Sequence, residues 1–319
     1  MKNNIEHQYV KLVKDVLDNG IAKQDRTGTG TLSVFGRQIR HDMAEGFPLL
    51  TTKKMAIKSI ATELKWFLKG RTDLRWLLEN NCNIWTGDAY ANFLRNSVPH
   101  DRQETIEEFA DRILKDNKFN QRWGNFGKIY GAAWRNFGGT DQIQLALEQL
   151  KTNPDSRRIR VSAWNPAVLD EVVLPPCHTD FQLYTREFSI KERVRAYEIR
   201  NYIKNIDPLD YAPKRAISLM FNMRSADIGL GLPFNIASYA ILLEMFAEEL
   251  NMVAEELVVN LGDAHIYNNH IPMLKEQITR QIFQPPLISL SDVNIYNGDF
   301  NYKIIDYVSH PKIEMPLSN

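Results

Sequence analysis

The stretch that decides the fold runs from residue 218 to residue 262 and joins two strands through one long apolar helix. It begins with SLMFNM at residues 218–223, continues with NIASYAILLEMFAEEL at residues 235–250, and ends with LVVNLG at residues 257–262. The helix has a wide apolar stripe, which predicts deep burial, and the stripe comprises Ile236, Tyr239, Ala240, Leu243, Phe246 and Ala247.

Helical and extended patterns interleave on both sides of this stretch. A first helix, with Tyr9, Val13 and Val16 on one face, is predicted to stop at Gly20. Further helices are predicted at residues 55–69, 73–79 and 142–150, and further strands at residues 32–40, 159–164, 181–184 and 302–306. Because the two kinds of element alternate to the end, we predict one large α+β domain over residues 1–319.

Two stretches stand apart from this pattern as predicted peripheral insertions. Residues 95–125 are rich in charge but carry a helical stripe, formed by Ile106, Phe109, Ala110, Ile113 and Leu114. Residues 186–215 are the most polar part of the chain, with eight Lys or Arg and five Asp or Glu. We predict a helical insertion for the first stretch and a surface excursion for the second.

Composition excludes several classes of protein. The chain has 39 Lys and Arg against 39 Asp and Glu, so a bulk electrostatic attraction to nucleic acid or to an anionic membrane is not expected. No apolar run approaches the roughly 20 residues that cross a bilayer, and the N-terminus does not resemble a signal peptide. Only two cysteines are present, which excludes a disulfide framework and a cysteine-based zinc site and fits a cytoplasmic protein.

Cys177 is a candidate nucleophile within the segment LPPCHT at residues 174–179. The alternative is a buried thiol that acts as a small apolar side chain, as lone cysteines usually do. Neighbouring side chains of an extended chain point to opposite faces, so Cys177 and His178 are not expected to form a papain-like pair. A reactive thiolate at this position would instead need another positive group nearby.

Four arginines lie at the ends of predicted elements. Arg26 falls in DRTGTGT at residues 25–31, Arg157 and Arg158 begin a strand, and Arg224 follows another strand. Each alone could be a solvated surface residue, but together they would suit a phosphate. The glycine-rich loop leads into a strand and not a helix, so it does not match a dinucleotide-binding fingerprint.

Glu63 is a candidate for proton transfer, because it lies at the edge of the apolar face of the helix at residues 55–69. Burial there would raise its pKa. The alternative is a carboxylate that reaches water or pairs with a lysine. Asp263, His265 and His270 could suggest a metal, but they lack a recognised ligand spacing.

Ten segments in one order resemble the thymidylate synthase family. They occupy residues 25–31, 47–54, 63–68, 130–131, 154–158, 162–166, 175–178, 224–227, 231–239 and 262–267. The resemblance covers nearly the whole chain apart from the stretches near 95–125 and 186–215. It implies a single α/β domain with a large mixed sheet flanked by helices, and a homodimer packed sheet against sheet.

The resemblance also implies a reaction, the reductive methylation of dUMP to dTMP. The Cys177 thiolate would add to uracil C6, which makes C5 able to attack the methylene group of 5,10-methylenetetrahydrofolate. The folate is also the reductant and leaves as dihydrofolate, so no metal, flavin or nicotinamide is expected. The expected partners are small molecules and a second copy of the chain, with no membrane and no required nucleic acid.

Residues of this chain that match the family's motifs receive implied roles. The implied catalytic set is Cys177, Glu63, Tyr130, Asn235 and Asp227. The implied dUMP contacts are Arg26, Arg157, Arg158, Arg224, Ser225, Ala226, Asp227, Asn235, His265, Ile266 and Tyr267. The implied folate contacts are Trp85, Asp227 and Ser318. In the family the pair matching Arg157 and Arg158 comes from the partner subunit, and the amide matching Asn235 reads uracil O4 and N3–H.

Three positions depart from the family pattern. Met223 stands where glutamine is usual, Ala56 where some members have histidine, and Ser318 lies in a tail that many members end differently. One alternative function is a pyrimidine nucleotide hydroxymethylase, in which water replaces hydride. Another is a non-catalytic nucleotide- or RNA-binding relative. Asn235 favours uracil and Trp85 favours hydride transfer, while a binding protein would not need the Cys177 thiol.

Overall fold

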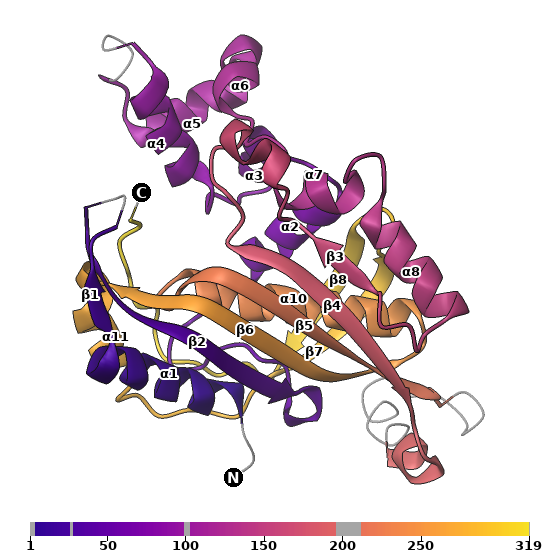
Figure 1. Cartoon of the computed structure of the whole chain (residues 1–319). Helices are drawn as coiled ribbons and strands as arrows, with labels where there is room; N and C mark the ends of the chain where they lie inside the picture. The colour runs from indigo at the N-terminus through magenta and orange to yellow at the C-terminus, as the bar shows by residue number, and fades with distance from the viewer. Residues whose placement is uncertain (1–3, 26–27, 99–102, 196–211, 319) are drawn as a thin grey trace.

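The centre of the protein is a six-stranded mixed sheet with the order β1-β2-β6-β5-β4-β3 (Figure 1). The structure, a computed structural model, describes residues 4–25, 28–98, 103–195 and 212–318. The strands are β1 (Ile21–Lys23), β2 (Thr31–Asp42), β3 (Arg160–Ser162), β4 (His178–Glu187), β5 (Arg215–Asp227) and β6 (Val253–Tyr267). Only β5 and β6 pair in parallel; the other neighbours are antiparallel. The predicted large mixed sheet is confirmed.

The helix α10 (Gly231–Glu249) connects the two parallel strands and lies behind the sheet in Figure 1. Parallel neighbours need such a crossover, because a tight turn cannot return the chain to the same end of the sheet. Its side chains are buried on nearly every side, including Ile236, Leu243 and Phe246, each with no exposed surface. The deeply buried helix predicted from residues 235–250 is therefore confirmed.

The other predicted helices also form, and they cover the core beside α10. They are α1 (Ile5–Asn19), α2 (Ile57–Leu68), α3 (Leu74–Glu79) and α8 (Gln142–Thr152). α1 ends before Gly20 as expected, and the Asp73 carboxylate caps α3 by accepting from the Trp76 backbone N–H at 3.1 Å. Three further elements were not predicted: α7 (Tyr130–Arg135), α11 (Ile271–Gln277) and β7 (Leu287–Asn294). β7 pairs with the predicted strand β8 (Asp299–Ile305).

The charge-rich segment forms a helical lobe at one end of the molecule (Figure 1). The segment contributes α5 (Ile106–Lys115) and α6 (Asn117–Trp123), which pack with the preceding helix α4 (Thr86–Asn96) around Phe93, Phe109, Phe119 and Trp123. Of the predicted helical stripe, Phe109 and Ile113 are fully buried, whereas Leu114 is 39% exposed. α5 and α6 are separate because Asp116 caps α6 through the Lys118 and Phe119 backbone N–H groups.

A ladder of polar side chains crosses five strands on the open face of the sheet. Arg160 donates to Asp180, Asn222 donates to the same carboxylate, and Asn260 donates to the Asn222 carbonyl. Gln38 of β2 completes the ladder by donating to Asn260 at 2.8 Å.

None of the described helices is long and apolar enough to cross a membrane. Most of the predicted excursion at 186–215 lies outside the described residues.

Candidate active site

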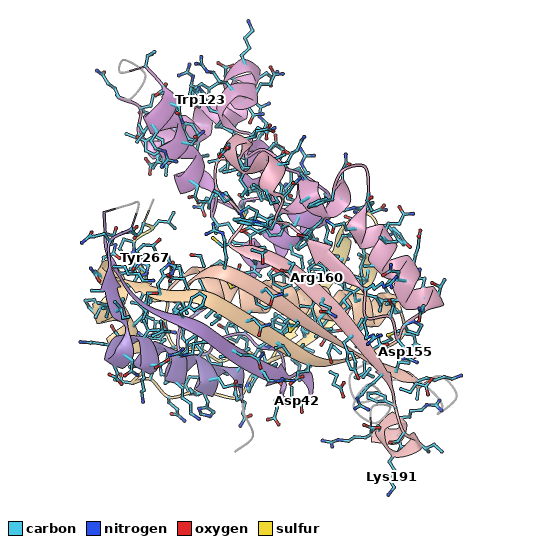
Figure 2. The ribbon with its side chains drawn as sticks, viewed as in Figure 1. Asp42, Trp123, Asp155, Arg160, Lys191 and Tyr267 are labelled. Carbon is cyan, nitrogen blue, oxygen red and sulfur yellow. The ribbon has the colours of Figure 1, made fainter. Side chains whose placement is uncertain are left out.

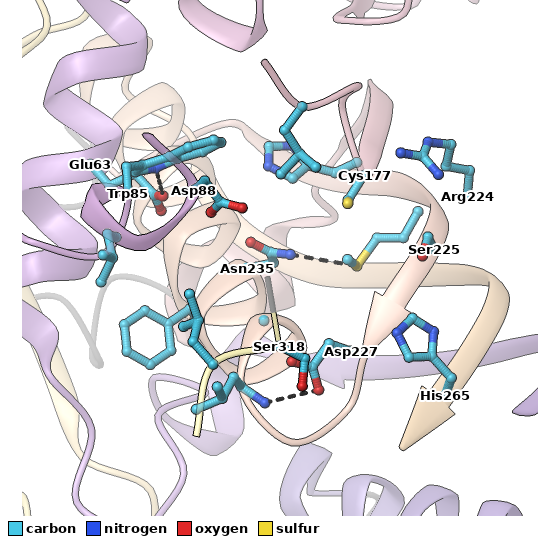
Figure 3. Close-up of a pocket in the computed structure, with 18 of the residues that line it drawn as sticks. Glu63, Trp85, Asp88, Cys177, Arg224, Ser225, Asp227, Asn235, His265 and Ser318 are labelled. Carbon is cyan, nitrogen blue, oxygen red and sulfur yellow. Dashed lines mark hydrogen bonds between the residues drawn. The ribbon is translucent and has the colours of Figure 1, made fainter. Parts of the chain in front are cut away.

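A cavity of about 370 Å³ opens where β5 and β6 end beside the first turn of α10 (Figure 3). Because the two strands are parallel and in register, Ser225 lies beside Asp263 and Asp227 beside His265. The polar side chains on its wall are Glu63, Asp88, Tyr130, Cys177, His178, Arg224, Ser225, Asp227, Asn235, His265, Tyr267 and Ser318. Most residues with an implied role therefore meet at one end of the sheet.

Cys177 lies on the turn that leads into β4 and is partly exposed to the cavity. Its backbone N–H donates to the Tyr130 hydroxyl at 2.7 Å. Arg224 holds the turn, since its guanidinium donates to the Pro175 and Pro176 carbonyls, each at 2.9 Å. Figure 3 shows this guanidinium beside Cys177, so the thiol has the positive neighbour that a thiolate requires.

His178 serves the structure behind the thiol. Its ring is buried and stacks on Tyr130, with the ring centres 4.0 Å apart, and Nδ1 lies 2.8 Å from the Tyr239 hydroxyl. Burial lowers the pKa of His178 to about 3, so the ring is neutral at physiological pH. This agrees with the expectation that Cys177 and His178 do not form a papain-like pair.

Glu63 reaches the cavity from α2 and is 8% exposed. Its partner is an indole and not a lysine: Trp85 Nε1–H donates to the carboxylate at 2.6 Å. Burial raises the pKa of Glu63 to about 7, although the hydrogen bond from Trp85 opposes that rise. A carboxyl group with a pKa near neutrality can both accept and release a proton at physiological pH.

Asn235 projects into the cavity from the N-terminal part of α10, one turn after Gly231. Its Nδ2 donates to the Met223 sulfur at 3.7 Å, a contact drawn as a dashed line in Figure 3. The carboxamide therefore faces the thioether at the position where the chain departs from the family pattern.

Asp227 and the C-terminal tail close the lower side of the cavity. The Asp227 carboxylate accepts from the Gly229 and Leu230 N–H groups, at 2.9 and 3.3 Å, and so fixes the turn before α10. The buried ring of His270 lies 3.7 Å from Asp227 and binds the Pro316 carbonyl at 2.6 Å. This contact brings the tail, with Ser318, to the cavity wall.

His265 is held by Asp263, whose oxygens are shared with other side chains. Ser33 donates to Asp263 at 2.7 Å, Lys23 pairs with it at 3.0 Å, and His265 Nδ1 lies 3.2 Å away. The Asp263 carboxylate therefore holds Ser33, Lys23 and His265 together at the edge of the cavity. Within the described ranges, no three His, Cys, Asp or Glu side chains group as a metal site would need.

Four implied contacts among the described residues do not line the cavity. Arg157 and Arg158 are exposed and do not line it. Figure 2 shows Asp155, two residues before Arg157, at the far end of the sheet from Tyr267. Ala226 and Ile266 are fully buried, so their side chains do not reach the cavity. Arg26 lies outside the described residues.

Sequence reasoning missed several parts of the site. Asp88 lines the cavity from α4, one helical turn after Trp85, and this spacing of three would have placed both on one face had α4 been predicted. Ile84, Leu174 and Phe234 add apolar wall. Lys53 is also buried nearby: it donates to the Gly229 carbonyl at 2.5 Å, and burial lowers its pKa to about 8.

Comparison with known proteins identifies the family. A family model described as Thymidylate synthase matches residues 7–319. The chain belongs to the thymidylate synthase family. It is 43% identical over 311 residues to a thymidylate synthase of Malacoplasma penetrans, covering 96% of this chain and 98% of that protein. It is 42% identical to that of Mesoplasma florum, covering 96% and 97%, and 38% identical to that of Staphylococcus haemolyticus, covering all of both chains.

Thymidylate synthases methylate dUMP to dTMP and use methylenetetrahydrofolate as co-substrate. They are generally dimeric enzymes that act on small molecules. The predicted family, fold class and reaction are confirmed at this level, and the hydroxymethylase alternative is not favoured.

Proposed function

We propose that the cavity carries out the reductive methylation of dUMP, with Cys177 as the nucleophile. The observation that carries this proposal is one cavity that brings together a thiol, the guanidinium of Arg224 and the carboxamide of Asn235. These are the groups needed to attack a pyrimidine, to attract an anionic substrate and to read the edge of the base.

The proposed reaction begins when the Cys177 thiolate forms a bond to uracil C6. The electron pair displaced to C5 attacks the methylene carbon of the folate, and loss of the C5 proton and of tetrahydrofolate leaves an exocyclic methylene. Hydride from the folate then reduces this methylene, the thiolate leaves C6, and dTMP and dihydrofolate result. Glu63 is positioned to organise the water that moves protons, and the Tyr130 hydroxyl lies beside the nucleophile for the C5 proton.

The remaining contacts are proposed from their places around the cavity. Arg224 and Ser225 would hold the phosphate, while His265 and Tyr267 would hold the ribose. Arg26, which lies outside the described residues, would join the phosphate site only by its match to the family motif. Trp85, Asp227 and Ser318 would contact the folate. Ala226 and Ile266 would contribute through their backbones, since both side chains are buried. We also propose that the enzyme is cytoplasmic, because both of its cysteines are free thiols.

One assay tests the proposal. The purified protein is incubated with dUMP and methylenetetrahydrofolate, and the absorbance of dihydrofolate is followed. A rise that requires dUMP is expected. Formation of tetrahydrofolate without this rise would indicate hydroxymethylation, and nucleotide binding without any product would indicate a non-catalytic relative.

Replacing Asn235 with aspartate should weaken the use of dUMP. A carboxylate would present only acceptors to uracil O4, while it could accept from cytosine N4–H. We expect kcat/KM for dUMP to fall roughly 10- to 100-fold, with dCMP improving relative to it. Measuring kcat/KM for both nucleotides tests this, and an unchanged ratio would show that Asn235 does not read the base.

We further propose that Arg157 and Arg158 act across a two-fold dimer interface on the open face of the sheet. Both are exposed and lie away from the cavity of their own chain. The open face carries the polar ladder and Tyr184, which is 61% exposed. A self-complementary interface would give each dimer two sites, each completed by the other chain.

Mixing subunits tests this arrangement. Chains with Cys177→Ser and chains with Arg157→Ala and Arg158→Ala should each have little activity, since each lost phosphate contact costs about 1.5–3 kcal/mol. In a mixed dimer, one site would combine an intact thiol with intact arginines. Activity should therefore return after the two variants are unfolded and refolded together. If the heterodimers remain inactive, Arg157 and Arg158 do not act on the active site of the partner chain.

A further inference from the structure

The Asn235 carboxamide has a single hydrogen-bond partner among the described residues, the sulfur of Met223. Asn235 Nδ2 lies 3.7 Å from this sulfur, and both residues line the cavity. Met223 is 3% exposed, whereas Asn235 is partly exposed to the cavity. Alternation along β5 places Met223, Ser225 and Asp227 on the same face, which explains why a strand residue reaches the amide.

The two ends of a carboxamide have nearly the same shape but opposite hydrogen-bonding roles. Uracil presents an acceptor at O4 and a donor at N3–H, whereas cytosine presents a donor at N4–H and an acceptor at N3. An asparagine in one orientation therefore matches uracil, and the same side chain rotated by 180° matches cytosine. An asparagine therefore does not select uracil by itself. The selection depends on the neighbouring group that fixes the orientation of its amide.

A thioether has no hydrogen to donate, so only the NH2 end of the amide can form a hydrogen bond with Met223. The opposite orientation would place the Asn235 carbonyl oxygen against the sulfur and lose that bond. We propose that Met223 is a positioning residue for base specificity, which holds Asn235 in the orientation that pairs with uracil and not with cytosine. This inference rests on the proposed reading of the base by Asn235, and it places O4 on the Met223 side of the amide.

Two substitutions separate the sulfur's role as an acceptor from its role in packing. Met223→Leu keeps an apolar side chain of similar size but removes the acceptor, whereas Met223→Gln supplies an amide that can either accept or donate. Met252→Leu is the matched control, because Met252 is a buried methionine outside the cavity wall. Thermal melting of each variant checks that it is folded.

The quantity to measure is the ratio of kcat/KM for dUMP to that for dCMP. With Met223→Leu this ratio should fall about three- to tenfold, because one weak hydrogen bond no longer biases the amide. Met223→Gln should also lower the ratio, because its amide can bond to either end of the Asn235 amide, and Met252→Leu should leave it unchanged. Calorimetric binding of dUMP and dCMP should show the same order of ratios without requiring turnover.

Several outcomes would overturn the inference. An equal loss for both nucleotides in Met223→Leu would mean that the methionine only packs. An unchanged ratio in Met223→Leu, together with a changed ratio in Asn235→Asp, would leave the proposed function intact and remove Met223 from it. A wild-type protein that binds both nucleotides equally would refute the inference directly, and a wild-type protein without dUMP turnover would refute the proposed function.

Discussion

Replacing Cys177 with serine is expected to reduce turnover by roughly four orders of magnitude or more while dUMP still binds. The first step needs an anionic nucleophile, and an alcohol is far less ionised than a thiol at neutral pH. The side chains proposed to hold the nucleotide, including Arg224, Asn235 and His265, are untouched by the change. Dihydrofolate formation measures the loss, and calorimetry with dUMP measures the retained binding.

Cys82→Ser is the matched control, because Cys82 is the other cysteine of the chain. It is fully buried, its sulfur lies 3.7 Å from the Ser59 carbonyl, and burial raises its pKa to about 11. A serine hydroxyl can donate to the same carbonyl, so activity should stay near the wild-type value. Substantial turnover by Cys177→Ser would refute the nucleophile assignment.

Glu63→Gln is expected to lower kcat by roughly 10²- to 10⁴-fold, the usual contribution of a general acid or base. Glutamine can still accept the Trp85 hydrogen bond, so the loss would reflect proton transfer and not collapse of the pocket. Since the Glu63 pKa is about 7, the pH profile of the wild-type enzyme should bend near that value. The bend should be absent from the variant, and a bend that persists unchanged would assign it to another group.

The same substitution should stabilise the folded protein at high pH. The Glu63 pKa is about 7 in the folded state against 4.5 for an unperturbed glutamate. A raised pKa favours folding below pH 4.5, and this contribution is lost as pH rises through 7. The free energy of unfolding of the variant minus that of the wild type should therefore be larger at pH 8 than at pH 4, by up to about 3 kcal/mol, because only the wild type loses this contribution. Chemical denaturation at both values tests this, and a difference independent of pH would contradict the raised pKa.

Wide apolar stripes made the core predictable from sequence. α10 and α2 carry many large apolar side chains on their buried faces, so their pattern stands out from the rest of the chain. α4 escaped prediction because its buried side chains are Thr86, Ala89 and Phe93, of which one is polar and one small. The break between α5 and α6 depends on one capping carboxylate, Asp116, and an apolar pattern alone does not show such a cap.

The site was less predictable, because its decisive contacts join residues that are far apart in sequence. The position of Glu63 at the edge of an apolar face indicated burial, but no local pattern indicates that Trp85 is its partner. The contact of Asn235 with Met223 depends equally on how α10 packs on β5. The proposed role of Arg157 and Arg158 requires a second chain, which a pattern along one chain cannot show.

The order of strands also determines how the protein can be made. β2 ends at Asp42, yet its long neighbour β6 begins only at Val253, with β1 covering just three residues of its other edge. At about 5–20 residues per second, a ribosome needs roughly 10–40 seconds to synthesise the intervening chain. Throughout that interval residues 31–42 lack the strand that pairs with most of them in the folded protein, and an unpaired strand edge is a template for aggregation. Fast expression should therefore depend on chaperones that shield β2 until β6 emerges.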